Sequence, residues 1–121
     1  MARIMVVDDS PTDVQNLKNI LSKAGYAVVE ASSGLDAIAR IKQEKPDCVI
    51  MDVVMPGVNG FQATRTLSKD PATAHIPVLV ISSKNQETDR VWALRQGARD
   101  YIVKPVKEAD LIAKIKAAIG G

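Results

Sequence analysis

The sequence has 121 residues, of which 46% are hydrophobic and 25% are charged, as in an ordinary globular protein rather than a disordered chain. This length predicts a single domain over residues 1–121, with a real core and no additional output domain. A net charge of +2 and an aromatic content of 3% argue against a nucleic-acid-binding surface. The N-terminal apolar run meets Asp8 and Asp9 at once, which excludes a signal peptide or membrane span and predicts a cytoplasmic protein.

The first strand and helix are predicted near the N-terminus. Arg3–Val7 is a short apolar run, typical of a buried strand. Ser10, Pro11 and Asp13 follow, which supply a hydroxyl N-cap, a proline in the first turn and an acid near the third helical position. We expect the helix that starts here to stop at Gly25.

The next two units repeat this order. Ala27–Ala31 is predicted to be a strand, and Ser33 opens a helix that ends before Pro46. Cys48–Met51 is the third strand, and Asn59 can open the third helix. The chain thus alternates strands with helices from its start to its middle.

The C-terminal half continues the alternation after a polar loop at Ser68–His75. Val78–Ile81 is the fourth predicted strand, Glu87–Gln96 the fourth helix and Tyr101–Val103 a short fifth strand. An apolar stripe from Leu111 to Ile119 marks a final helix. Five strands alternating with five helices predict an α/β fold with a parallel sheet covered on both faces.

Polar residues follow four of the five predicted strands. They are Asp8 and Asp9 after the first strand, Asp52 after the third, Ser82 and Ser83 after the fourth, and Lys104 with Pro105 after the fifth. Each residue alone has an ordinary explanation, such as a turn, a cap or a solvated lysine. Because the carboxyl ends of parallel strands share one edge of the sheet, together they predict a functional site.

The residue types at this edge point to phosphoryl chemistry. Converging carboxylates repel one another, which raises the pKa of some of them unless a cation joins them. Hard oxygen ligands suit Mg²⁺, whereas Cys48 and His75 cannot build a zinc site. A magnesium ion, Lys104 and a hydroxyl would neutralise a transferring phosphoryl group, and an aspartate can act as its nucleophile.

Four motifs carry a resemblance to a known family. DDS at 8–10, MDVVMPGVNG at 51–60, VISS at 80–83 and YIVKP at 101–105 closely resemble the receiver domain of bacterial response regulators, in order and over nearly the whole chain. This resemblance implies a flavodoxin-like, doubly wound (βα)5 fold with parallel strand order 2-1-3-4-5.

The resemblance also implies roles around a phosphorylation site. Asp52 would accept a phosphoryl group from a phosphohistidine of a histidine kinase. Ser82 would bond the resulting acyl phosphate, and Lys104 would neutralise it. Tyr101 matches a switch aromatic that turns inward when Ser82 moves toward the phosphoryl group. The resemblance therefore implies a phosphoacceptor signalling domain and not an enzyme, although such a domain assists its own phosphorylation and dephosphorylation.

The same resemblance implies a magnesium site. Asp9, Asp52 and the backbone carbonyl of Val54 would hold Mg²⁺, and Asp8 would support it, partly through water. No organic cofactor is implied.

A narrower resemblance concerns the segments GFQATR at 60–65 and VWALRQGARDYIVKPV at 91–106. They are similar to single-domain regulators of type IV pilus chemosensory systems, which implies twitching motility and output by protein contact. Regulators of phototaxis or flagellar chemotaxis, or a phosphate sink, are the alternatives. Trp92 is either half-buried on the fourth helix or an exposed contact on the face formed by the fourth helix, fifth strand and fifth helix.

Three other functions fit parts of the pattern. A flavodoxin-like flavin protein would need a hydroxyl-rich phosphate loop after the first strand, where Asp8 and Asp9 would repel a phosphate. A phosphatase with an aspartyl nucleophile would place that residue after the first strand, whereas here Asp52 follows the third. A receiver that no longer takes a phosphoryl group is disfavoured by the complete set of acids, hydroxyl and lysine.

Overall fold

The computed structural model describes residues 2–53, 59–84 and 86–120, in which five strands alternate with five helices. The strands are β1 (Arg3–Val7), β2 (Ala27–Ala31), β3 (Cys48–Asp52), β4 (Val78–Ser82) and β5 (Asp100–Val103). The helices are α1 (Pro11–Lys23), α2 (Gly34–Glu44), α3 (Gly60–Lys69), α4 (Glu87–Arg95) and α5 (Glu108–Ile119). All neighbouring strands are parallel, in the order β2-β1-β3-β4-β5. The predicted flavodoxin-like topology is confirmed.

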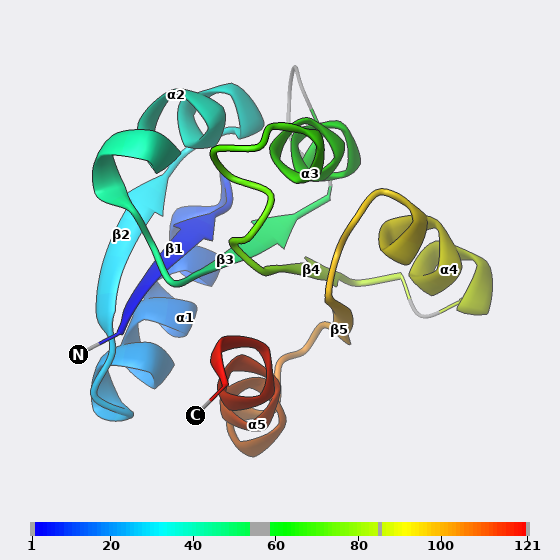
Figure 1. Ribbon diagram of the computed structural model, residues 1–121. Helices are drawn as coiled ribbons and strands as arrows, with labels where there is room; N and C mark the ends of the chain where they lie inside the picture. Colours follow the sequence, from blue (N-terminus) through cyan, green and yellow to red (C-terminus); the bar gives the residue numbers. More distant parts are fainter. Residues whose placement is uncertain (1, 54–58, 85, 121) are drawn as a thin grey trace.

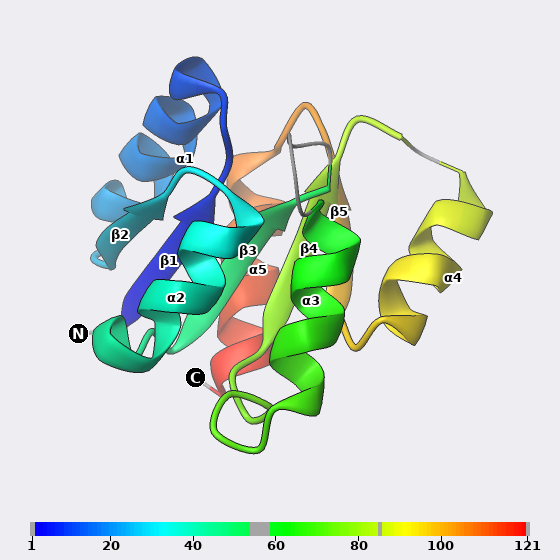
Figure 2. The same cartoon turned by 90° about the horizontal axis from the view of Figure 1, so that it is seen from above.

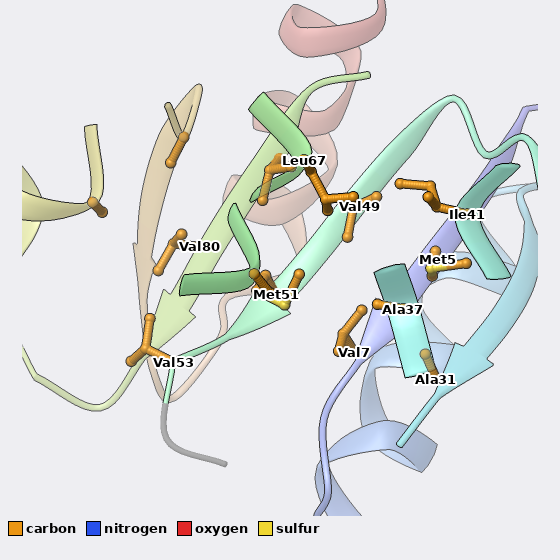
Figure 3. Packing of buried hydrophobic residues seen from close by; sticks show 14 of the residues in the cluster. Met5, Val7, Ala31, Ala37, Ile41, Val49, Met51, Val53, Leu67 and Val80 are labelled. Carbon is orange, nitrogen blue, oxygen red and sulfur yellow. The ribbon is translucent and has the colours of Figure 1, made fainter. Parts of the chain in front are cut away.

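The sheet is the middle of three layers. Helices α1 and α5 cover one face, and α2, α3 and α4 lie on the other (Figures 1 and 2). Alternate residues of a strand point to opposite faces, so Ile4 and Val6 pack toward α1 and α5, whereas Met5 and Val7 pack toward the other helices. Figure 3 shows this second cluster, in which Met5 and Val7 lie near Ala37 of α2.

Side-chain caps fix where the first three helices begin. The Ser10 hydroxyl accepts a hydrogen bond from the Asp13 amide at 3.4 Å, and Ser33 accepts one from Asp36 at 3.0 Å. At α3, Asn59 and Gln62 form a reciprocal capping box. The starts of these helices were therefore readable from local sequence.

The element ends differ from the sequence prediction by one or two residues. Strands β3 and β4 each run one residue further than predicted, because Asp52 pairs with Ile81 and Ser82 pairs with Val103 in the sheet. The polar loop begins after Lys69 rather than at Ser68, since α3 continues to Lys69.

Helix α4 is the least embedded element. Ala93 is its buried residue, whereas Trp92 is 49% exposed. Figures 1 and 2 both show α4 beside β5, at the outer side of the sheet. Trp92 is therefore open to solvent over about half of its surface, and its role as a contact for a partner stays a prediction.

Within the described ranges, no helix has both the length and the hydrophobicity needed to cross a lipid bilayer.

Candidate functional site

The acidic cluster, defined as Asp8, Asp9 and Asp52, lies at the carboxyl edge of the sheet. Asp8 directly follows β1, and Asp52 is the last residue of the adjacent strand β3. Each of the three residues offers one carboxylate oxygen, and these oxygens lie within 4.8 Å of one another. Asp8 and Asp52 are buried, whereas Asp9 is exposed. The predicted convergence of the carboxylates is therefore present.

Asp8 is held in place by the backbone on both sides. Its amide donates a hydrogen bond to the Ala31 carbonyl at 3.2 Å, which ties the end of β1 to β2. Its carboxylate accepts a hydrogen bond from the Ser10 amide at 2.9 Å. Asp8 therefore links the sheet edge to the start of α1.

Lys104 brings a positive charge to the acidic cluster from the far end of the chain. Its ammonium Nζ lies 3.6 Å from Asp52, 3.4 Å from Asp8 and 2.8 Å from Asp13. The Lys104 amide donates to the Ser82 carbonyl at 2.7 Å, and the Lys104–Pro105 peptide bond is cis. These contacts place the lysine head at the same sheet edge as the acids.

Burial and charge act in opposite directions on the ionisation of this site. Burial, reinforced by the charge of Asp8, raises the pKa of Asp52 from 3.8 to about 6, although Lys104 opposes the shift. Burial alone would lower the pKa of Lys104. The hydrogen bond from Lys104 to Asp13 and the negative charges nearby outweigh burial, so the pKa of Lys104 is raised. The lysine stays charged, and the Asp52 carboxylate is destabilised by its surroundings.

Ser82 and Tyr101 meet at the backbone of one residue. The Ser82 hydroxyl accepts a hydrogen bond from the Lys84 amide at 3.1 Å. The Tyr101 hydroxyl donates to the Lys84 carbonyl at 2.8 Å, and its ring is only 4% exposed. The aromatic predicted to be a switch therefore lies in an inward position, connected to Ser82 through a single peptide segment.

Two residues that matter for the site, Gly60 and Asp13, were assigned from the sequence to a motif or a helix start and not to the site. A Cβ atom added to Gly60 would lie 2.0 Å from the backbone oxygen of Asp52, so only glycine lets α3 approach this strand end. Asp13 makes the shortest contact of Lys104. Its position in the first turn after Asp8 and Asp9 was the available signal, because this turn starts at the same sheet edge.

The backbone carbonyl of Val54, predicted to bind metal, and the turn at Met55–Gly57 lie outside the described residues. The donor set that is described consists of hard carboxylate oxygens, which fit Mg²⁺ better than a softer transition metal. The raised pKa of Asp52 has the same implication, since a bound dication would relieve the repulsion between Asp52 and Asp8. The acidic cluster could hold such a cation.

Known proteins share this sequence and fold. Residues 4–116 match the response regulator receiver domain family. The chain is 55% identical to Protein PilH of Pseudomonas aeruginosa over 121 residues, covering 100% of both chains. It is 39% identical to response regulator PleD of Caulobacter vibrioides over 96% of this chain but only 26% of that protein. The resemblance to the pilus-type regulators noted in the sequence agrees with the match to PilH.

Solved structures of receiver domains and chemotaxis proteins share this fold. The Vibrio cholerae chemotaxis protein CheY4 superimposes with a TM-score of 0.90 at 27% identity, over 98% of both chains. The receiver domain of the sensor histidine kinase PA1611 from Pseudomonas aeruginosa, solved with a magnesium ion coordinated in its active site cleft, superimposes with a TM-score of 0.91 at 27% identity, over 99% of this chain and 98% of that one. This chain belongs to the response regulator receiver domain family.

Proposed function

We propose that the protein is a stand-alone response regulator that accepts a phosphoryl group on Asp52 from a phosphohistidine of a histidine kinase. The observation that carries this proposal is a buried carboxylate at a strand end, 3.6 Å from the Lys104 ammonium and grouped with Asp8 and Asp9. A nucleophile beside a fixed cation is what phosphoryl transfer requires, because its catalysis consists mainly of positioning and charge neutralisation.

The proposed transfer is a substitution at phosphorus. A carboxylate oxygen of Asp52 attacks the phosphorus, a P–O bond forms, and the P–N bond to the imidazole breaks with its electron pair returning to nitrogen. The Lys104 ammonium neutralises charge on the phosphoryl oxygens of the acyl phosphate. Gly60 allows the start of α3 to pack directly against the backbone of Asp52, the residue that attacks.

Asp8, Asp9, Asp52 and the Val54 backbone carbonyl are proposed to hold Mg²⁺. When bound, this ion would supply positive charge to oxygens that the protein alone cannot neutralise. Two observations support the assignment, namely the oxygen-only donor set and the magnesium ion in the cleft of the similar PA1611 receiver domain.

The signal is proposed to leave the site through Ser82 and Tyr101. A phosphoryl group on Asp52 would offer the Ser82 hydroxyl a strong charged acceptor. Movement of Ser82 would disturb its hydrogen bond with the Lys84 amide. The backbone carbonyl of Lys84 also accepts a hydrogen bond from the Tyr101 hydroxyl. The rearrangement would therefore reach β5 and the neighbouring α4.

The α4–β5–α5 face is proposed to bind the downstream protein. Large hydrophobic side chains are exposed there on α4 and β5: Val91, Trp92, Leu94 and Val103. Exposed tryptophan is a frequent anchor of protein interfaces. We propose an output in type IV pilus motility, which agrees with the full-length match to PilH, and a cytoplasmic location.

Incubation with Mg²⁺ and a small-molecule phosphodonor, followed by intact-mass measurement, tests this function. One phosphoryl group should add to the protein, and chelation of Mg²⁺ should prevent it. An unchanged mass with Mg²⁺ present would contradict the proposal.

A further inference from the structure

Lys104 donates its best hydrogen bond to a carboxylate outside the acidic cluster. The distance from its Nζ to Asp13 is 2.8 Å. The hydrogen bond to Asp8 is longer, at 3.4 Å, and the 3.6 Å separation from Asp52 exceeds ordinary hydrogen-bond range. The ammonium is therefore shared among three acids, and Asp13 holds it most closely.

The fold fixes Asp13 in this position. Asp13 occupies the first turn of α1, where its amide donates to the Ser10 hydroxyl. The Ser10 amide in turn donates to the Asp8 carboxylate. The turn that presents Asp13 is thus anchored to the acidic cluster itself, through two hydrogen bonds from backbone amides to side-chain oxygens.

The lysine head has room on the α1 side. A cavity of about 140 Å³ lies between α1 and the segment after β5, and Asp13, Asn16 and Lys104 are among its lining residues. The Lys104 side chain is 21% exposed, so the ammonium can turn toward Asp13 without complete loss of solvent. In its observed position the ammonium lies 0.8 Å closer to Asp13 than to Asp52, at 2.8 Å against 3.6 Å.

We propose, resting on the proposed function, that Asp13 is a positioning residue that competes with Asp52 for Lys104. While Asp52 carries no phosphoryl group, Asp13 draws the ammonium toward α1. During phosphoryl transfer the ammonium leaves Asp13 to neutralise the phosphoryl oxygens, and breaking this contact slows the transfer. Asp13 therefore sets how readily the regulator is phosphorylated.

The test compares phosphorylation rates by a small phosphodonor with Mg²⁺ present. Asp13→Asn should accelerate the reaction about two- to fivefold, which corresponds to the loss of a half-exposed ion pair. Asp13→Glu, which keeps the charge, should restore a rate close to that of wild type. An Asp13→Asn rate equal to or below that of wild type would overturn the proposal.

Asp36 provides a matched control. It occupies the first turn of α2, and its amide donates to the cap residue Ser33, as Asp13 does to Ser10. Asp36→Asn removes an acid of the same helical position that is paired with Arg40 rather than Lys104. Asp36→Asn should leave the phosphorylation rate unchanged, and an equal acceleration would show that the effect of Asp13 comes from net charge or helix stability alone.

Two further measurements separate the effect on Lys104 from simple repulsion of an anionic donor. In the Lys104→Ala background, Asp13→Asn should lose its accelerating effect, because the two residues act as a pair. A retained acceleration would overturn the proposal. In protein labelled with ¹⁵N-lysine, Asp13→Asn should displace the Lys104 side-chain resonance, and Asp36→Asn should not.

The Lys104 resonance also distinguishes failure of the Asp13–Lys104 competition from failure of phosphorylation itself. If Asp13→Asn displaces the Lys104 resonance but wild type takes no phosphoryl group, the proposed function is overturned. The role of Asp13 in transfer then falls with it. If wild type is phosphorylated normally but Asp13→Asn leaves the Lys104 resonance in place, the role of Asp13 alone is overturned.

Discussion

The Tyr101 hydroxyl donates a 2.8 Å hydrogen bond to the backbone carbonyl of Lys84, whose amide donates to the Ser82 hydroxyl at 3.1 Å. One residue of the segment after β4 therefore connects a buried aromatic side chain to a hydroxyl at the site. Because both bonds use the backbone of Lys84, a displacement of this segment changes both at once. The connection joins Ser82 to Tyr101 of β5, and it is the route by which we propose that phosphorylation of Asp52 is sensed at α4.

Tyr101→Phe tests that route. The ring stays buried while the bond to Lys84 is lost, which should lower the free energy of unfolding by about 0.5–1.5 kcal/mol. The substitution should also reduce the change in Trp92 fluorescence on phosphorylation. Tyr26→Phe is the control, because within residues 2–53, 59–84 and 86–120 no hydrogen bond of the Tyr26 hydroxyl is found. A full fluorescence change in Tyr101→Phe would contradict the route.

Lys104→Ala should separate phosphorylation from signalling. The protein contains one tryptophan, so its fluorescence reports on α4. Without the ammonium that holds the new charge, the phosphorylated variant should show no fluorescence change although its mass shows the added group. Lys107→Ala, an exposed lysine just beyond the site, should respond like wild type. A normal response from Lys104→Ala would refute the assigned role.

The raised pKa of Asp52 predicts a pH-dependent stability in metal-free protein. With a pKa of about 6 in the folded state against 3.8, the folded protein binds this proton more tightly than the unfolded chain does. The stabilising contribution is therefore full below about pH 4 and is lost as the pH rises through about 6. Asp52→Asn cannot ionise, so it should be more stable than wild type at about pH 8 by on the order of 2–3 kcal/mol.

Denaturant unfolding with a chelator present, at several pH values, measures this difference. The stability gap between Asp52→Asn and wild type should close as the pH falls toward about 4. A gap that does not change with pH would show that the Asp52 carboxylate is not destabilised by burial and Asp8.

Magnesium should stabilise the folded protein through the acidic cluster. A ligand at about a hundred times its Kd adds about 2.7 kcal/mol when it binds only the folded state. We expect the Tm to rise with Mg²⁺ in wild type and to rise much less in Asp9→Asn. Asp47→Asn is a control, because Asp47 directly precedes the first residue of β3, at the end of the strand away from Asp52. An equal rise in Asp9→Asn, or an equal rise with NaCl at the same ionic strength, would contradict a specific site.

Much of the fold was predictable because most strand residues are apolar. Residues such as Val49 and Ile50 are buried on opposite faces of the sheet, so the central strand β3 is an apolar run up to Asp52, whereas the edge strand β2 carries the exposed Glu30. The placement of Asp8, Asp52 and Lys104 was predictable for a related reason, since parallel strands bring their carboxyl ends to one edge.

The contacts of Lys104 and Tyr101 were not predictable in the same way. Lys104 and Asp13 are 91 residues apart in the sequence, and their contact depends on how the first turn of α1 sits against the segment after β5. The hydrogen bond from Tyr101 is accepted by the backbone carbonyl of Lys84. Every residue has such a carbonyl, so the amino-acid sequence does not indicate this partner. The exposure of Trp92 was also open, because α4 lacks the apolar stripe that would orient it.

Phosphorylation of Asp52 is tested most directly by locating the phosphoryl group with peptide mass spectrometry after reaction with a small phosphodonor and Mg²⁺. We expect a single modified peptide containing Asp52 in wild type and in Asp47→Asn, and no modification in Asp52→Asn. A phosphoryl group on another residue of wild type, or equal labelling of Asp52→Asn, would contradict phosphorylation of Asp52.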